Sequence, residues 1–132
     1  MKTLILVVDD EADVETLFRQ QFRRELREGR YEMEFTLSAA EALACVDAAR
    51  AADLILVLSD VNMPGMSGLD FLPQIRAKRP DVPVYMITAY GDAATRAKAL
   101  ERGARAFLTK PIDFSELRAR IVGRLAEIGR AA

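Results

Sequence analysis

Four short stretches of the chain are almost continuously apolar, and each stops where polar or turn-forming residues begin. Runs of this length and ending are typical of strands buried on both faces of a parallel sheet. A fifth stretch alternates large apolar residues with Glu and Thr, the period of a strand with one wetter face, which favours an edge position. The expected strands are 3–8, 31–37 (the alternating one), 54–59, 82–88 and 106–109.

Between these stretches, apolar residues recur at helical spacing and predict five helices. The first is expected to run from Val14 through Leu26, with Gly29 as its stop. Capping boxes of the form S/D-x-x-E, at Ser38 and at Asp113, are expected to open the second and the last helix. The expected helices cover 14–26, 38–49, 68–78, 91–101 and 113–128.

Strands that alternate with helices predict a parallel sheet with right-handed crossovers and helices on both faces. The expected fold is therefore an α/β three-layer sandwich, with a five-stranded parallel sheet and five helices. At 132 residues, and without a linker, repeat or low-complexity segment, the chain is interpreted as a single domain over 1–132.

Polar side chains follow four of the predicted strands. They are Asp9 and Asp10 after the first strand, Asp60 after the third, Thr88 at the end of the fourth and Lys110 after the fifth. The carboxyl ends of parallel strands share one edge of the sheet, so these groups are expected to converge where open α/β sheets bind ligands.

The three carboxylates are the informative part of this group. Two carboxylates about 4 to 5 Å apart repel each other by roughly 3 to 4 kcal/mol at an effective dielectric constant of 20, so three need cations nearby. Lys110 supplies one positive charge, and a divalent metal could supply the rest. Oxygen ligands with room for water favour Mg²⁺, or Mn²⁺, over zinc.

Such a metal, a lysine and a hydroxyl are also the parts that neutralise a transferring phosphoryl group. With Asp60 as the nucleophile, the product would be an acyl phosphate.

The net charge, the lack of histidine and the length of the apolar runs exclude several classes of function. The 19 basic and 20 acidic residues give a net charge of −1, so we expect no direct nucleic-acid partner. The absence of histidine excludes His-based catalysis and phosphohistidine carriage by this chain. No apolar run is long enough to span a membrane, and the chain start turns acidic too soon for a signal peptide, so we expect a cytoplasmic protein with no membrane contact.

Four motifs in order and in register carry a family resemblance. They are VVDDE at 7–11, SDVNMPGMSG at 59–68, ITAYG at 87–91 and FLTKP at 107–111. The chain resembles, over essentially its whole length, a CheY-like receiver domain of bacterial two-component response regulators. The resemblance implies a flavodoxin-like fold with strand order 2-1-3-4-5.

The resemblance also assigns the acceptor and metal residues. It implies that Asp60 accepts a phosphoryl group from a sensor histidine kinase or a phosphotransfer protein. It further implies that Mg²⁺ is held by Asp10, Asp60 and the backbone carbonyl of Asn62, with Asp9 helping through water. In this interpretation the chain is a signalling domain that catalyses only its own phosphorylation and dephosphorylation.

The remaining implied roles concern the switch. Lys110 matches the lysine that contacts the phosphoryl oxygens, in a usually cis bond to Pro111, and Thr88 matches the hydroxyl that turns toward them. Phe107 matches an aromatic residue that rotates inward, which would alter a docking surface made of the fourth helix, the fifth strand and the fifth helix. That surface is expected to include Arg96, Lys98, Glu101, Arg102, Arg118 and Arg120.

Three alternatives share parts of this pattern. An Asp-nucleophile phosphatase usually has a second Asp where this chain has Asn62, and a flavin carrier needs a phosphate-binding loop where this chain has three acids. A phosphorylation-independent pseudo-receiver would not need the complete set of acids, hydroxyl and lysine. No sequence motif identifies the downstream partner, which could be another protein, an output domain or a second copy in a homodimer.

The bulky side chain of Tyr90 is expected to shield the phosphoryl group from water and so to slow its loss.

Overall fold

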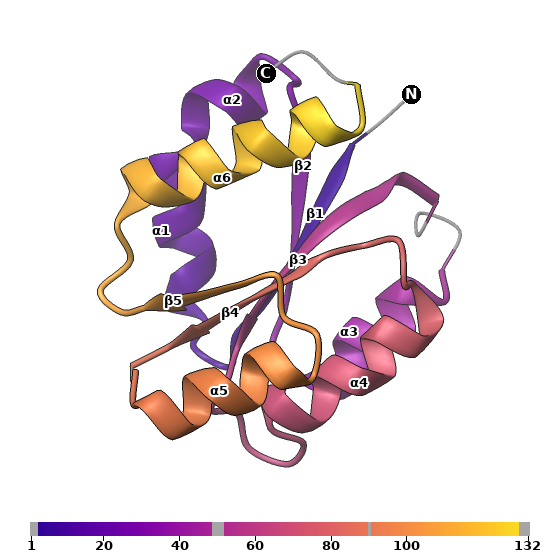
Figure 1. The fold of residues 1–132 in the computed structure, drawn as a ribbon. Helices are drawn as coiled ribbons and strands as arrows, with labels where there is room; N and C mark the ends of the chain where they lie inside the picture. The colour runs from indigo at the N-terminus through magenta and orange to yellow at the C-terminus, as the bar shows by residue number, and fades with distance from the viewer. Residues whose placement is uncertain (1–2, 49–51, 90, 130–132) are drawn as a thin grey trace.

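A five-stranded, fully parallel sheet forms the centre of the molecule (Figure 1). The computed structural model describes residues 3–48, 52–89 and 91–129. The order of the strands is β2-β1-β3-β4-β5, which confirms the expected order and the edge position of β2. The strands are β1 (Leu4–Val8), β2 (Glu32–Thr36), β3 (Leu54–Asp60), β4 (Val84–Thr88) and β5 (Ala106–Thr109).

Helices cover both faces of this sheet and complete three layers (Figure 1). On one face lie α1 (Asp13–Gln21), α2 (Arg23–Arg27) and α6 (Phe114–Glu127). On the other lie α3 (Ala39–Val46), α4 (Gly68–Lys78) and α5 (Ala93–Glu101). The expected three-layer α/β sandwich is therefore confirmed.

The apolar strands supply two cores because successive side chains point to opposite faces. In β1, for example, Leu4 and Leu6 pack under α3 and α4, whereas Ile5 and Val7 pack under α1 and α6. Every residue of β1, β3 and β4 is buried. The sheet is thus held rigidly from both sides, and its strand ends are fixed in position.

The expectation of five helices is wrong, because the described residues form six. The predicted first helix is divided at Phe22, whose φ of −106° and ψ of 19° leave the helical region. No proline or glycine lies between residues 13 and 27, so the local sequence contains no helix breaker. Phe22 is fully buried, and its ring packs against Phe18, Tyr31 and Phe114, so the interruption occurs where tertiary packing fixes the backbone.

Helix starts agree with the capping pattern. The Ser38 hydroxyl accepts a hydrogen bond from the Glu41 amide at 3.1 Å, and Asp113 caps α6 through the Glu116 amide at 3.1 Å. The helix predicted to start at residue 91 begins two residues later, because Asp92 is its cap and α5 begins at Ala93. Among the described residues, no helix is long and apolar enough to cross a bilayer.

Candidate functional site

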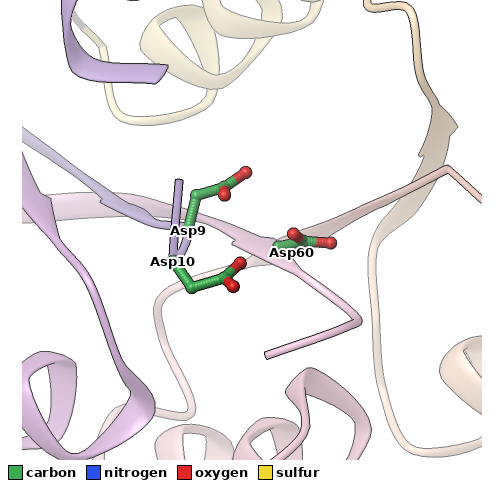
Figure 2. A group of neighbouring side chains, drawn as sticks. All are labelled: Asp9, Asp10 and Asp60. Carbon is green, nitrogen blue, oxygen red and sulfur yellow. The ribbon is translucent and has the colours of Figure 1, made fainter. Parts of the chain in front are cut away.

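The strand ends bring the predicted acids together. Asp9 and Asp10 follow β1, and Asp60 is the last residue of β3. One carboxylate oxygen from each of the three lies within 4.8 Å of the others, and Figure 2 shows the three side chains side by side at this edge of the sheet. The predicted convergence of the carboxylates is therefore present in the structure.

Asp60 is buried, with 5% of its surface exposed, and its Oδ1 accepts a hydrogen bond from the Asn62 amide at 3.2 Å. Burial, and then the negative charge of Asp9, raise the pKa of Asp60 above its ordinary value, and the Asn62 amide and Lys110 oppose this rise only in part. The ionised form of this carboxylate is therefore destabilised and gains from any cation or electrophile placed beside it.

Lys110 is the cation that the chain itself provides. Its Nζ lies 3.1 Å from Asp9 Oδ2, 3.3 Å from Asp60 Oδ2 and 4.0 Å from Glu11 Oε1. Burial alone lowers the pKa of Lys110, but the hydrogen bonds and charges of the two aspartates together outweigh it and raise the pKa. The lysine thus stays protonated in this site. Its peptide bond to Pro111 is cis, as the family resemblance implies.

The donor set fits a hard divalent cation. All three side chains offer carboxylate oxygens, and Asp10 is exposed, so one side of the cluster is open to water. Mg²⁺ keeps several waters and takes only one or two carboxylates from a protein. Asp9 also accepts a hydrogen bond from Lys110 at 3.1 Å, so the lysine already offsets part of the negative charge of the cluster.

Thr88 closes the site on the β4 side. Its hydroxyl is fully buried and accepts a hydrogen bond from Asn62 Nδ2 at 3.1 Å. Sequence reasoning gave Asn62 only a backbone role, and this side-chain contact was missed because the two residues are 26 positions apart. No local pattern signals such a pair.

Two further residues support the strand ends. A Cβ added at Gly68 would lie 2.1 Å from the backbone oxygen of Asp60, so any larger residue would displace the strand end. Phe107 of β5 is buried, with 8% of its surface exposed, and packs in the same cluster as Met86 of β4 and Ala99 of α5. Phe107 is therefore a core residue in this structure, whatever part it takes in switching.

The expected docking surface loses two of its members. The Arg118 guanidinium donates to Glu25 Oε2 and to the Gln21 carbonyl, both at 2.6 Å, so it faces α1 and α2. Arg102 donates to the Leu69 carbonyl at 2.7 Å and so faces α4. The reason is geometric, since two positions along a helix differ by about 200° in direction, and Arg118 cannot face the same way as residue 120.

Four of the expected residues remain on the surface of α5 and α6, namely Arg96, Lys98, Glu101 and Arg120. Tyr90 lies outside the described residues, so its shielding role stays a prediction.

Comparisons with known proteins agree with this geometry. The family model described as "Response regulator receiver domain" matches residues 5–122. The chain is 40% identical over 124 residues to the DNA-binding transcriptional regulator NtrC of Rhizobium meliloti, covering 93% of this chain and 24% of that protein. It spans about a quarter to a half of the length of the curated relatives it matches.

Solved structures share the fold. A CheY-like receiver domain protein from Methanospirillum hungatei superposes with a TM-score of 0.83 at 29% identity, covering 96% of both chains. A complex described as CheX-CheY-BeF3-Mg+2 from Borrelia burgdorferi matches with a TM-score of 0.79 at 26% identity, covering 92% of this chain and 87% of that one.

Proposed function

Since the chain belongs to the response regulator receiver domain family, whose members are signalling domains, we propose that Asp60 is its phosphoacceptor. One observation carries this assignment: Lys110 contacts Asp9 and Asp60 at once, at the edge of the sheet where three carboxylates meet. The donor in this proposal is the phosphohistidine of a sensor histidine kinase or of a phosphotransfer protein. The proposal includes a cytoplasmic location for the domain, as part of a two-component system.

The transfer itself needs no proton from this chain. A carboxylate oxygen of Asp60 forms a bond to phosphorus as the P–N bond of the phosphohistidine breaks, and the electron pair of that bond leaves with the imidazole nitrogen. Charge builds up on the phosphoryl oxygens during this step. Lys110 lies within 3.3 Å of Asp60 and is placed to offset that charge.

The metal in this proposal is Mg²⁺, with Mn²⁺ as a substitute. Asp10, Asp60 and the Asn62 carbonyl would hold it directly, and Asp9 would hold it through water. When bound, the ion supplies positive charge beside the phosphoryl oxygens. These residues would orient it because they lie at the ends of β1 and β3, two strands that are buried on both faces.

The output of the domain is a change of surface. A phosphoryl group on Asp60 adds negative charge and acceptor oxygens, which attract the hydroxyl of Thr88 and the ammonium of Lys110. Thr88 would then leave its bond with Asn62, and Phe107, which packs below α5, would adjust to the vacated space. The surface of α5, β5 and α6 would change, and a downstream protein, an output domain or a second copy in a homodimer would read it.

Intact-protein mass after incubation with acetyl phosphate and Mg²⁺ tests the acceptor. We expect a gain of one phosphoryl group that disappears in Asp60→Asn and in the presence of a chelator. Asp113→Asn is the matched control, since this aspartate only caps α6, and it should retain the gain. A gain that persists in Asp60→Asn would place the acceptor elsewhere, and no gain even with a partner kinase would indicate a phosphorylation-independent interaction module.

A further inference from the structure

Helix α4 contains a proline at its sixth position, beyond the first turn where proline is well tolerated. Pro73 has no amide hydrogen, so the carbonyl of Leu69, four residues earlier, lacks its normal donor within the helix. The proline ring also crowds that carbonyl and turns it away from the helix axis. The sequence alone therefore predicts a weak point in α4 at Leu69.

Arg102 supplies the missing donor from another helix. Its Nη1 lies 2.7 Å from the Leu69 carbonyl oxygen and 3.1 Å from Asp70 Oδ1. A hydrogen bond from a charged donor is stronger than a neutral one. The bridge to Asp70 adds little because 67% of that side chain is exposed. The bond to the carbonyl is thus the principal contact of this guanidinium.

The backbone of Arg102 is itself fixed. The residue caps the end of α5, where the Ala104 amide donates to Ala99 at 3.0 Å and the Gly103 amide donates to Leu100 at 3.1 Å. This pair of bonds, with Gly103 at a φ of 103°, is a Schellman motif. The arginine therefore starts from a defined position, and its reach to Leu69 holds the end of α5 against α4.

The first turn of α4 is in turn joined to the strand that carries Asp60. The Gly68 amide donates to the Val61 carbonyl at 2.8 Å, and Gly68 lies directly against the backbone oxygen of Asp60. Leu69 is the next residue. A continuous set of contacts thus runs from the end of β3 through the start of α4 to the C-terminal end of α5.

We propose that Arg102 is a positioning residue that replaces the amide missing at Pro73 and fixes the C-terminal end of α5 to the first turn of α4. The consequence for signalling rests on the proposed function. The C-terminal end of α5 stays in place when the domain is phosphorylated, and the shift is confined to the N-terminal end, next to β4 and Thr88.

A double-mutant cycle on the unmodified protein tests the first part. We expect Arg102→Met, which keeps the aliphatic stem, to raise the unfolding equilibrium constant in urea about tenfold. In a Pro73→Ala background, residue 73 can donate to Leu69 itself, so the same change should raise the constant twofold or less. An equal effect in both backgrounds would overturn the proposal.

Asp70→Asn separates the salt bridge from the carbonyl bond. We expect it to change the unfolding constant by less than threefold and to leave the effect of Arg102→Met in place. If Asp70→Asn reproduced the whole effect of Arg102→Met, the hydrogen bond to the Leu69 carbonyl would contribute nothing to the stability of the fold, and the proposal would be wrong. No phosphoryl group or metal enters these measurements, so their outcome does not depend on the proposed function.

Amide hydrogen exchange tests the second part. In Arg102→Met we expect the amides of residues 100–104 to exchange about fivefold faster, and in the matched control Arg96→Met, an exposed residue of the same helix, to exchange at the wild-type rate. With beryllofluoride and Mg²⁺ bound to the wild type, exchange should change at residues 93–97 and not at 100–104. Equal changes in exchange at both ends of α5 would contradict the proposal that its C-terminal end stays in place. Absence of beryllofluoride binding would contradict both the proposed function and this consequence for signalling.

Discussion

Asn62 and Thr88, at the ends of two neighbouring strands, are joined by a hydrogen bond of 3.1 Å from Nδ2 to Oγ1. The bond holds the Thr88 hydroxyl at the same edge of the sheet as the candidate acceptor, whose carboxylate accepts from Lys110 at 3.3 Å. A phosphoryl group on Asp60 would have to compete with Asn62 for that hydroxyl. A side chain of the acceptor loop therefore contributes to the resting position of Thr88.

Asn62→Ala is expected to tighten binding of beryllofluoride and Mg²⁺ by about two- to tenfold, the range that corresponds to loss of one ordinary competing hydrogen bond. The measurement is a titration followed by the methyl resonances of Thr88 and Ile87. In a Thr88→Val background the substitution should have no further effect, because the hydroxyl is already absent. An unchanged or weaker affinity in the single variant would contradict the competition.

Lys110→Met is expected to slow phosphoryl uptake from acetyl phosphate at least tenfold, because the transferring charge loses its fixed counter-charge. The same change leaves Asp9 and Asp60 facing each other without a cation, and should lower the free energy of unfolding by about 1 to 2 kcal/mol. Adding Mg²⁺ should restore much of the stability but not the rate. A variant that matches the wild-type rate would remove Lys110 from the transfer.

Asp60→Asn is expected to raise thermal stability in the absence of Mg²⁺, because it removes a buried negative charge that lies beside Asp9. The pKa of Asp60 is raised, so the destabilisation by this carboxylate is present at neutral pH and decreases as the pH falls through the folded-state pKa. The difference from the wild type should shrink in the same direction. Thermal unfolding at several pH values, with and without Mg²⁺, measures both effects.

Glu25 and Arg118 should contribute a stability term of the opposite pH dependence. Burial alone would raise the pKa of Glu25, but the hydrogen bond and charge of Arg118 outweigh it and lower the pKa. The contribution is therefore complete above the ordinary pKa of 4.5 and is lost as the pH falls through the lower folded-state value. Glu25→Gln should lower stability at pH 7 by about 1 kcal/mol, since Arg118 is partly exposed, and should flatten the urea-unfolding profile below pH 5.

Substitutions at Phe107 can distinguish a packing role of its ring from a role in the switch. Phe107→Ala should cost about 3 kcal/mol of stability because the ring is buried, whereas Phe107→Leu should cost much less. If the ring takes part in the switch, binding of a downstream partner will depend less on phosphorylation in Phe107→Leu than in the wild type. The check is partner affinity with and without beryllofluoride, and equal dependence in both proteins would leave Phe107 as a core residue only.

Local sequence patterns were enough to predict the three layers of this fold and the edge of the sheet where the acidic residues gather. Continuous apolar runs that alternate with helices are typical of a parallel sheet covered on both faces, and the acids that end two of these runs then meet at one edge. Asp9, Asp10 and Asp60 do so within 4.8 Å. The helix caps at Ser38 and Asp113 were readable for the same reason, because they depend on neighbours three residues away.

Features that depend on contacts between residues far apart in the chain could not be predicted in this way. The break at Phe22 has no local breaker and coincides with the packing of a fully buried ring. The Arg118 side chain turns toward Glu25 of α2, and the periodicity of residues along α6 gives no information on where α2 lies. The bond from Arg102 to the carbonyl exposed by Pro73 spans 33 positions. Local patterns fix which faces are buried, but the partner of a polar group across a gap is settled only when the helices are packed together.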